Sequence, residues 1–200
     1  MYEPTEGCIL FDGIDIKEFA LVEWQTKISF VFQSFIHYEA TAGANIAYGD
    51  WKYLYNKPEQ VKHIARLAKV DELISSMPQR YDTLLGRIFG QYTPSVGQWQ
   101  KLAIARAFAR QDSMLLILDE PTASLDTQAE YELFRNFTDL TVGKTTLLIS
   151  HRFSTVSIAD KILVFSEGRL VENGSHEELL TPDGHYATFY RLWHSNIKKA

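Results

Sequence analysis

The chain has little of what several classes of protein require. Its 200 residues include one cysteine, Cys8, which excludes an internal disulfide and favours a reducing compartment. Its apolar runs, such as 114–118, are far shorter than the ~20 residues that cross a bilayer. The net charge of −5 leaves no basic surplus for binding nucleic acid, so we expect no such partner. The amino end has neither the basic nor the apolar part of a secretory signal.

A glycine-rich phosphate-binding loop is missing as well, although one triplet imitates its end. Gly143, Lys144 and Thr145 match the close of the Gly-x4-Gly-Lys-Ser/Thr motif, but Thr138 stands where its first glycine belongs. In that motif the lysine opens a helix, whereas Lys144 leads into a strand-like apolar run. Gly143 is typical of the residue just beyond a helix end. We interpret the triplet as a helix end and not as a phosphate site.

The spacing of apolar residues predicts an α/β protein. A hairpin is expected around Asp12-Gly13, within residues 8–16. Helical spacing covers 58–77, 98–111 and 128–140, and strand-like runs cover 27–33, 114–118, 145–149 and 161–165. Strands that alternate with helices indicate a parallel sheet, and ligands bind at the carboxyl ends of its strands.

Two adjacent carboxylates follow the run 114–118, where Pro121 prevents the strand from continuing. Asp119 can hold Mg²⁺, and Glu120, pointing the other way, can polarise a water molecule as a general base. For a bare Asp-Glu pair, a solvated acidic turn would be the better explanation. The whole string "LLILDEPTASLD", 115–126, is far more specific.

This string resembles the Walker B segment and D-loop of ABC-type ATPases, the motor domains of ATP-driven transporters. The resemblance implies that Asp119 associates with Mg²⁺ and that Glu120 is the catalytic glutamate. It also implies that Ser124 and Asp126 belong to a loop that touches an opposing subunit. ATP and Mg²⁺ are therefore the implied cofactors.

The segment "PSVGQWQKLAIARAFAR", 94–110, resembles the ABC signature motif and its helix. Ser95, Gly97 and Gln98 match the motif, and the resemblance implies that they grip the γ-phosphate of ATP bound by the other subunit, as helix N-termini hold anions. Pro94 and Val96 replace the usual leucine and first glycine, and Val96 adds a side chain where close approach is expected. The alternative is that these residues only cap the helix.

Two further side chains resemble family residues through their order along the chain. Gln33, after a predicted strand, resembles the Q-loop glutamine that senses Mg²⁺ and the attacking water. His151, after the run 145–150, resembles the switch histidine that contacts the γ-phosphate and positions water with Glu120. His176 is expected only to start a helix.

Two segments have an alternative assignment. The aromatic stretch 35–53 faces transmembrane partners in the family, but here it could instead fill the core of a helical subdomain. Segment 81–90 resembles the exporter region that contacts coupling helices, with Arg87 in place of the usual glutamate, and a solvated loop is the alternative.

The resemblance implies a P-loop NTPase-like fold: a three-layer core with a parallel sheet, a helical subdomain and a small antiparallel β region. We expect a single partial domain, 1–200, in which a helical subdomain of about 40–100 is inserted into the core 1–39 and 101–200. The implied partners are ABC transmembrane domains and a second nucleotide-binding domain in a head-to-tail dimer. The implied location is the cytoplasmic face of a membrane.

The family places its Walker A loop ahead of the segment that corresponds to residues 2–16, and the sequence has no such loop. We therefore expect an amino-truncated motor domain of exporter type that binds ATP very weakly alone. Because the Walker A strand lies between the strands at 145–150 and 161–165, we expect a gap there, direct pairing of those strands, or completion by another chain. The alternatives are an impaired partner subunit that lends its signature motif to another ABC subunit, and an inactive remnant.

Overall fold

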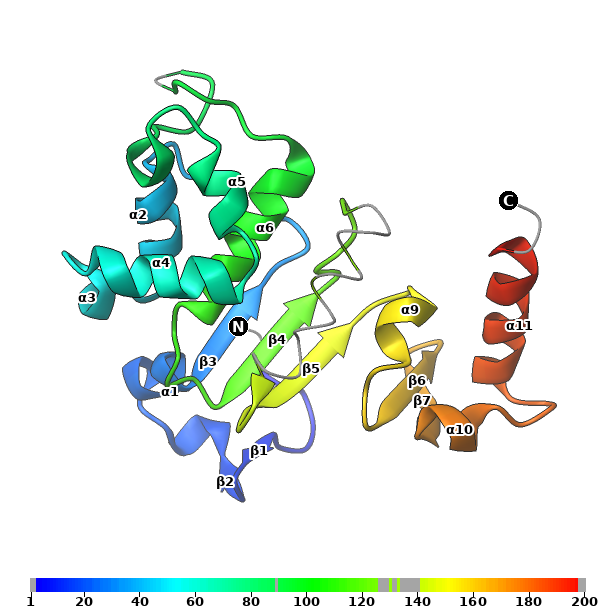
Figure 1. Cartoon of the computed structure of the whole chain (residues 1–200). Helices are drawn as coiled ribbons and strands as arrows, with labels where there is room; N and C mark the ends of the chain where they lie inside the picture. Colours follow the sequence, from blue (N-terminus) through cyan, green and yellow to red (C-terminus); the bar gives the residue numbers. More distant parts are fainter. Residues whose placement is uncertain (1–2, 89, 126–129, 131–132, 134–140, 198–200) are drawn as a thin grey trace. The chain divides into compact units, whose positions relative to one another are not determined.

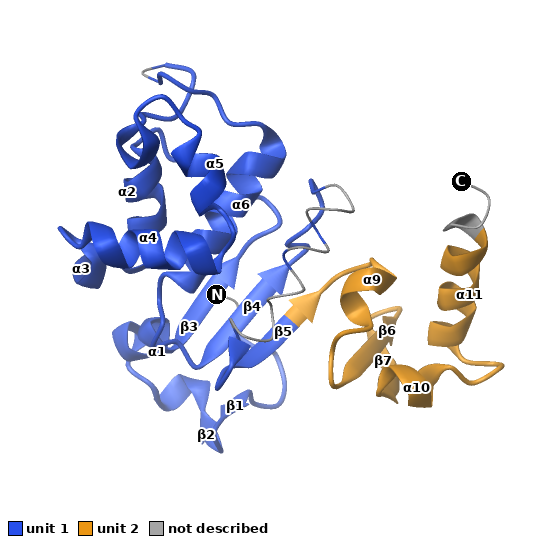
Figure 2. Ribbon diagram, in the orientation of Figure 1, with its two compact units in different colours: residues 1–147 blue, residues 148–200 orange. Residues whose placement is uncertain are grey.

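The computed structural model describes residues 3–88, 90–125, 130, 133 and 141–197 (Figure 1). They divide into two compact units, 1–147 and 148–200, which Figure 2 colours separately. No helix in this described part of the chain combines the length and apolar character of a membrane span.

The first unit begins with the predicted hairpin. Strands β1 (Leu10–Phe11) and β2 (Ile14–Asp15) pair antiparallel around Asp12 and Gly13, whose φ angles of +50° and +82° are those of a tight primed turn. The short η1 (Ile16–Glu18) and helix α1 (Leu21–Lys27) follow. Trp24 of α1 is buried against the rings of Phe11 and Phe19.

A three-stranded sheet confirms the α/β prediction. Strands β3 (Ile28–Val31), β4 (Leu115–Asp119) and β5 (Thr145–Ile149) lie in this order, and their arrows point the same way in Figure 1. β3 and β4 pair in parallel, with Val31 opposite Leu118. The predicted strand 27–33 was too long at its end, because pairing stops at Val31 and Gln33 lies two residues beyond it.

Most helices of the first unit gather beside this sheet. They are α2 (Ala42–Ala47), η2 (Tyr48–Asp50), α3 (Trp51–Leu54), α4 (Pro58–Leu67), α5 (Asp71–Ser75), η3 (Arg80–Asp82) and α6 (Val96–Phe108). α6 packs against α2, α4 and β3, and its residues Leu102 and Ile104 are fully buried. The proposed bounds of about 40–100 for an inserted subdomain stay a prediction.

The expected single helix over 58–77 was wrong. The chain leaves the helix at Lys69, where φ is +55°, and the amide of Val70 donates to the carbonyl of Ala65 at 2.9 Å. This bond is typical of the turn that closes an α-helix. Apolar spacing continues across the break because α4 and α5 both bury residues such as Ile64 and Ile74.

The second unit contains α9 (Phe153–Val156), β6 (Ile162–Ser166), β7 (Arg169–Gly174), α10 (His176–Leu179) and α11 (His185–Ile197). β6 and β7 pair antiparallel, and Ile162, Leu179 and Tyr186 form the core. The Glu172 carboxylate accepts bonds from the amides of His185 and Tyr186, which lowers the pKa of Glu172. His176 begins α10 after the cap Ser175, as predicted.

The strands β5 and β6 belong to separate sheets, so the described residues do not show the direct pairing that was one expected outcome. Leu147 and Ile149 of β5 are about half exposed, whereas Leu116 and Leu118 of β4 are buried. In the second unit, Phe165 of β6 is also exposed. The expected helix over 128–140 lies almost wholly outside the described residues.

Candidate functional site

The start of α6 is held by its own side chains. The backbone amide of Gln98 donates to Ser95 Oγ at 3.3 Å, and the backbone amide of Ser95 donates to Gln98 Oε1 at 2.9 Å. Together these two bonds form a capping box. Tyr92 Oη also donates to Gln98 Oε1, at 3.2 Å. The capping alternative therefore describes what these side chains do here. Ser95 accepts in its bond, so its hydroxyl hydrogen can still be donated to an anion.

The two departures from the signature pattern lie on either side of the cap residue. Val96 is the first helical residue and is 58% exposed, while Pro94 is buried. Gly97 lies so close to the loop after β4 that a Cβ atom would stand 3.0 Å from the carbonyl oxygen of Ser124. A larger residue at position 97 would therefore require this loop to shift by a few tenths of an ångström.

The carboxylate pair lies at the carboxyl end of β4, as predicted. Asp119 is the last residue of the strand, and Glu120 takes a left-handed conformation with φ +49°. Such a conformation costs a non-glycine residue on the order of 1 kcal/mol or more, and it turns the chain sharply at this point. Both residues are half-buried, and the Glu120 atom Oε2 is shielded from solvent.

A buried glutamine that the sequence analysis missed connects the two segments. Gln100 of α6 is 1% exposed. Its Nε2 donates to the Glu120 carbonyl at 3.3 Å, and its Oε1 accepts from the Ser124 amide at 3.0 Å. The signal in the sequence is an amide side chain among the otherwise apolar buried positions of a helix. The two hydrogen bonds of Gln100 thus join the signature-like helix to the turn that contains Asp119 and Glu120.

Gln33 follows the end of β3, and Asp119 is the last residue of the neighbouring parallel strand β4. Both residues therefore lie at the carboxyl ends of these strands. Their amide and carboxylate oxygens are ligands that Mg²⁺ accepts. Among the described residues, no group of three or more His, Cys, Asp or Glu could hold a metal by itself. Mg²⁺ usually keeps water and substrate phosphates and takes only one or two carboxylates, so this donor set fits the ion.

Arg106 of α6 bonds both to the segment after Gln33 and to helix α2. Its Nε donates to the Asn45 carbonyl at 2.9 Å and its Nη2 to Asn45 Oδ1 at 3.0 Å. Its Nη1 donates to the Ile36 carbonyl at 3.2 Å, and the guanidinium lies 4.4 Å from the centre of the Tyr38 ring. The pKa of Arg106 is lowered by burial, and the interaction with Tyr38 only partly opposes this change.

A second contact in this region stacks His37 on Trp99, with ring centres 4.6 Å apart and planes within 7°. Burial lowers the pKa of His37, and the charge of Arg106 lowers it further. Two independent contacts therefore join residues 36–38 to α6.

The Gly-Lys-Thr triplet is a helix end, as predicted. Gly143 has φ +74°, and the Lys144 amide donates to the Thr141 carbonyl at 2.9 Å. Lys144 Nζ donates to the carbonyls of Gln111 and Ser113 and, at 3.0 Å, to Ser113 Oγ. Burial lowers the pKa of Lys144. The ammonium stabilises the turn before β4 and so has a structural role.

His151 belongs to the second unit, where it is exposed two residues beyond the end of β5. The neighbouring amide of Arg152 donates to Ser150 Oγ at 3.1 Å. Asp126, the remaining candidate, lies outside the described residues.

Comparison with known proteins decides the family. A family model described as ABC transporter matches residues 1–123. The chain belongs to the ABC transporter family. It is similar to ATP-dependent lipid A-core flippases, with 41% identity to that of Legionella pneumophila strain Paris and 43% to that of Hahella chejuensis. Each alignment covers 191 residues, 96% of this chain and 32% of the flippase.

A solved structure gives the same result for the fold. The chain is similar to a bacterial Atm1-family ABC exporter with ATP bound, with a TM-score of 0.86 and 35% identity, over 96% of this chain and 32% of that one. The three-dimensional match supports the P-loop NTPase-like fold that the resemblance implied. The chain spans about a third of the length of these relatives.

The two segments that resemble partner-contacting regions of ABC exporters differ in exposure. In the aromatic stretch, Tyr48, Trp51 and Tyr53 are exposed and do not fill a core, whereas Phe35 and Tyr38 are half-buried. In segment 81–90, Leu85 is buried, whereas Arg87 and Ile88 are exposed.

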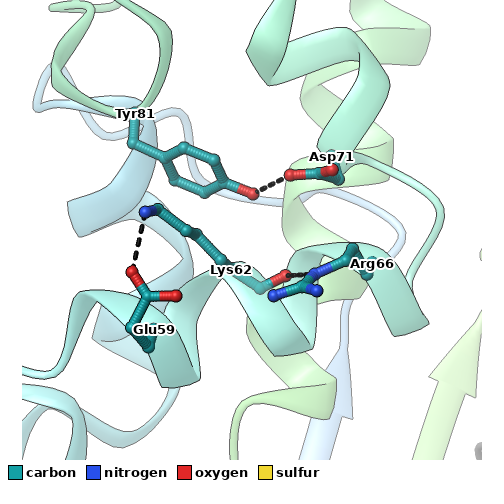
Figure 3. A network of polar contacts seen from close by, with 5 residues as sticks. All are labelled: Glu59, Lys62, Arg66, Asp71 and Tyr81. Carbon is teal, nitrogen blue, oxygen red and sulfur yellow. Dashed lines mark hydrogen bonds and ion pairs between the residues drawn. The ribbon is translucent and has the colours of Figure 1, made fainter.

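Segment 81–90 is anchored at its start. Tyr81 Oη donates to Asp71 Oδ1 at 2.5 Å, beside the pair formed by Lys62 and Glu59 at 2.8 Å (Figure 3). Burial, followed by this bond to Asp71, raises the pKa of Tyr81. The loop is therefore fixed at its base and exposed at Arg87 and Ile88. Its contact with coupling helices stays a prediction.

Proposed function

We propose that the chain is the greater part of the ATP-hydrolysing domain of an exporter-type ABC transporter. The observation that carries this proposal is the turn after β4, where the backbone carbonyl of Glu120 and the backbone amide of Ser124 are bonded to Gln100 of the signature-like helix. In the proposed reaction, Glu120 accepts a proton from the water that attacks the γ-phosphate. Asp119 and Gln33 would hold Mg²⁺, and the resemblance assigns to His151 a contact with the γ-phosphate. Bound Mg²⁺ would neutralise charge that develops on phosphate oxygens.

The signature residues act on a different nucleotide. Ser95, Gly97 and Gln98, with Ser124 and Asp126, face ATP bound by a second nucleotide-binding domain in a head-to-tail dimer. The exposed start of α6 supports this assignment because its amides and the Ser95 hydroxyl can reach an anion outside the chain.

The chain alone should bind ATP very weakly. Lys144 Nζ is held by the carbonyls of residues 111 and 113, and the sequence has no glycine-rich loop to surround the phosphates. An assembly with transmembrane domains at the cytoplasmic face of a membrane would place the exposed aromatic residues 48–53 against those domains. The names of the similar flippases make a lipid the first cargo class to test.

A second candidate is a partner subunit that does not turn over ATP itself but lends its signature motif to another subunit. The observation that favours it is the fully formed capping box at Ser95, in a chain whose only Gly-Lys-Thr triplet is structural. The two candidates share the same α6 surface and differ in whether Glu120 acts.

ATP turnover separates the candidates. The chain would be assayed alone and then mixed with a complete ABC motor subunit that carries an inactivating substitution of its own signature serine. Both candidates expect no turnover from the chain alone and measurable turnover in this mixture, lost with Ser95→Ala. With a motor subunit whose own general base is inactivated and whose signature serine is intact, only the proposal expects turnover, and that turnover is lost with Glu120→Gln. Turnover by the isolated chain at typical transporter rates, about 1 per second or more, would contradict the account of the missing phosphate loop.

A further inference from the structure

We propose that Gln100 is a positioning residue: its side-chain amide holds the turn that carries Glu120 to the start of the signature-like helix α6. This inference rests on the proposed function, in which α6 and Glu120 act on two different nucleotides. It adds that one buried amide makes these two surfaces of the same chain move together.

The first observation is the way the amide is used. Gln100 is 1% exposed, and its two ends are bonded in opposite senses, to the Glu120 carbonyl at 3.3 Å and from the Ser124 amide at 3.0 Å. The orientation of the amide is fixed by these partners, because only Nε2 can donate and only Oε1 can accept. A buried amide with both ends satisfied specifies one arrangement of its neighbours.

The second observation is the strained conformation that this amide supports. Glu120 has φ +49°, which a glutamate adopts only when its surroundings enforce it. The Glu120 carbonyl accepts from Gln100 Nε2 and also from the Ala123 amide at 3.2 Å. These two bonds fix the peptide that follows the Glu120 side chain, and with it the direction in which the carboxylate points.

The third observation is a close approach one turn earlier on the same face of α6. A Cβ atom at Gly97 would stand 3.0 Å from the Ser124 carbonyl oxygen, so the loop and the helix start are already in contact. Gln100 follows Gly97 by one helical turn and lies on the same face. A shift of the helix start therefore moves Ser124 by contact and Glu120 through the amide of Gln100.

The first test needs no nucleotide. Gln100→Met removes both bonds at nearly constant volume, and amide hydrogen exchange of the chain would be measured by NMR. We expect the Ser124 amide to exchange at least about tenfold faster, beyond any change at the Ile104 amide in the interior of α6. Gln111→Met, an exposed position, is the matched control and should change neither amide. Equal acceleration at Ser124 and Ile104, or none, would overturn the proposal.

The second test uses a mixture of the chain with a complete motor subunit whose own general base is inactivated and whose signature serine is intact, so that turnover depends on Glu120. Gln100→Met should lower kcat by about tenfold to a hundredfold, with KM for ATP within about twofold of that of the unmodified chain. An unchanged kcat, or a loss confined to KM, would refute the positioning role.

The two tests also distinguish this inference from the proposed function. If the unmodified mixture does not turn over ATP while Gln100→Met still exposes the Ser124 amide selectively, the tie between α6 and the turn stands and the assignment of hydrolysis to Glu120 fails.

Discussion

Replacing Arg106 with methionine should destabilise the first unit more than any surface substitution. Arg106→Met keeps an aliphatic stem of similar length but removes the donors to both oxygens of the fully buried Asn45. Charge-assisted hydrogen bonds contribute roughly 1.5–3 kcal/mol each, and the contact with the Tyr38 ring adds about 0.5–2 kcal/mol. The bond to Ile36 is exposed and adds little.

Taking the lower values for the two bonds to Asn45, and adding the ring contact, gives a loss of about 3.5–5 kcal/mol. With a slope near 2 kcal/mol per molar, the urea midpoint followed by circular dichroism should fall by roughly 1.8–2.5 M. Arg66→Met is the matched control, since Arg66 is exposed and donates only to the Lys62 carbonyl of its own helix. Equal midpoints for the two variants would refute the role given to Arg106.

The remaining predictions concern Lys144 and His37. Lys144→Met should lower the free energy of unfolding by about 1–3 kcal/mol, because it removes the Lys144 ammonium that donates to the carbonyls of residues 111 and 113. It should not change nucleotide affinity in the mixture. A loss of affinity would restore the triplet as a phosphate site. The folded-state pKa of His37 is lowered, so its stabilising contribution is complete above pH 6.5 and is lost as pH falls through that lower pKa. The urea midpoint should therefore decline from about pH 8 to pH 5.5 in the unmodified chain and decline less in His37→Phe; parallel declines would contradict the assignment.

The sequence was sufficient for the fold where local chemistry and long-range packing agree. The Asp12-Gly13 turn, the strand 145–149 and the helix end at Gly143 all follow from residues that strongly prefer one conformation. The break at Lys69 could not be foreseen, because lysine gives no local signal for a left-handed conformation and apolar spacing continues on both sides of it.

The candidate site was predicted by pattern and completed by contacts. Asp119, Glu120 and Ser95 stand out because of the strings around them, and the structure places Asp119 at a strand end and Ser95 at a helix start. Gln100 and Arg106 could not be assigned, since their partners Ser124 and Asn45 are distant in the sequence and are brought to α6 only by the fold. The role of Lys144 was predicted in outline, whereas its acceptors required the structure.

The central claim is that the turn after β4 carries the carboxylate that hydrolyses ATP. The most direct test is single-turnover hydrolysis at high ATP concentration in a mixture of this chain with a complete motor subunit whose own general base is inactivated and whose signature serine is intact, comparing Glu120 with Glu120→Gln. The account predicts that Glu120→Gln leaves ATP binding within about twofold and slows the chemical step by roughly a hundredfold or more. An unchanged rate of hydrolysis at undiminished binding would show that Glu120 is not the general base.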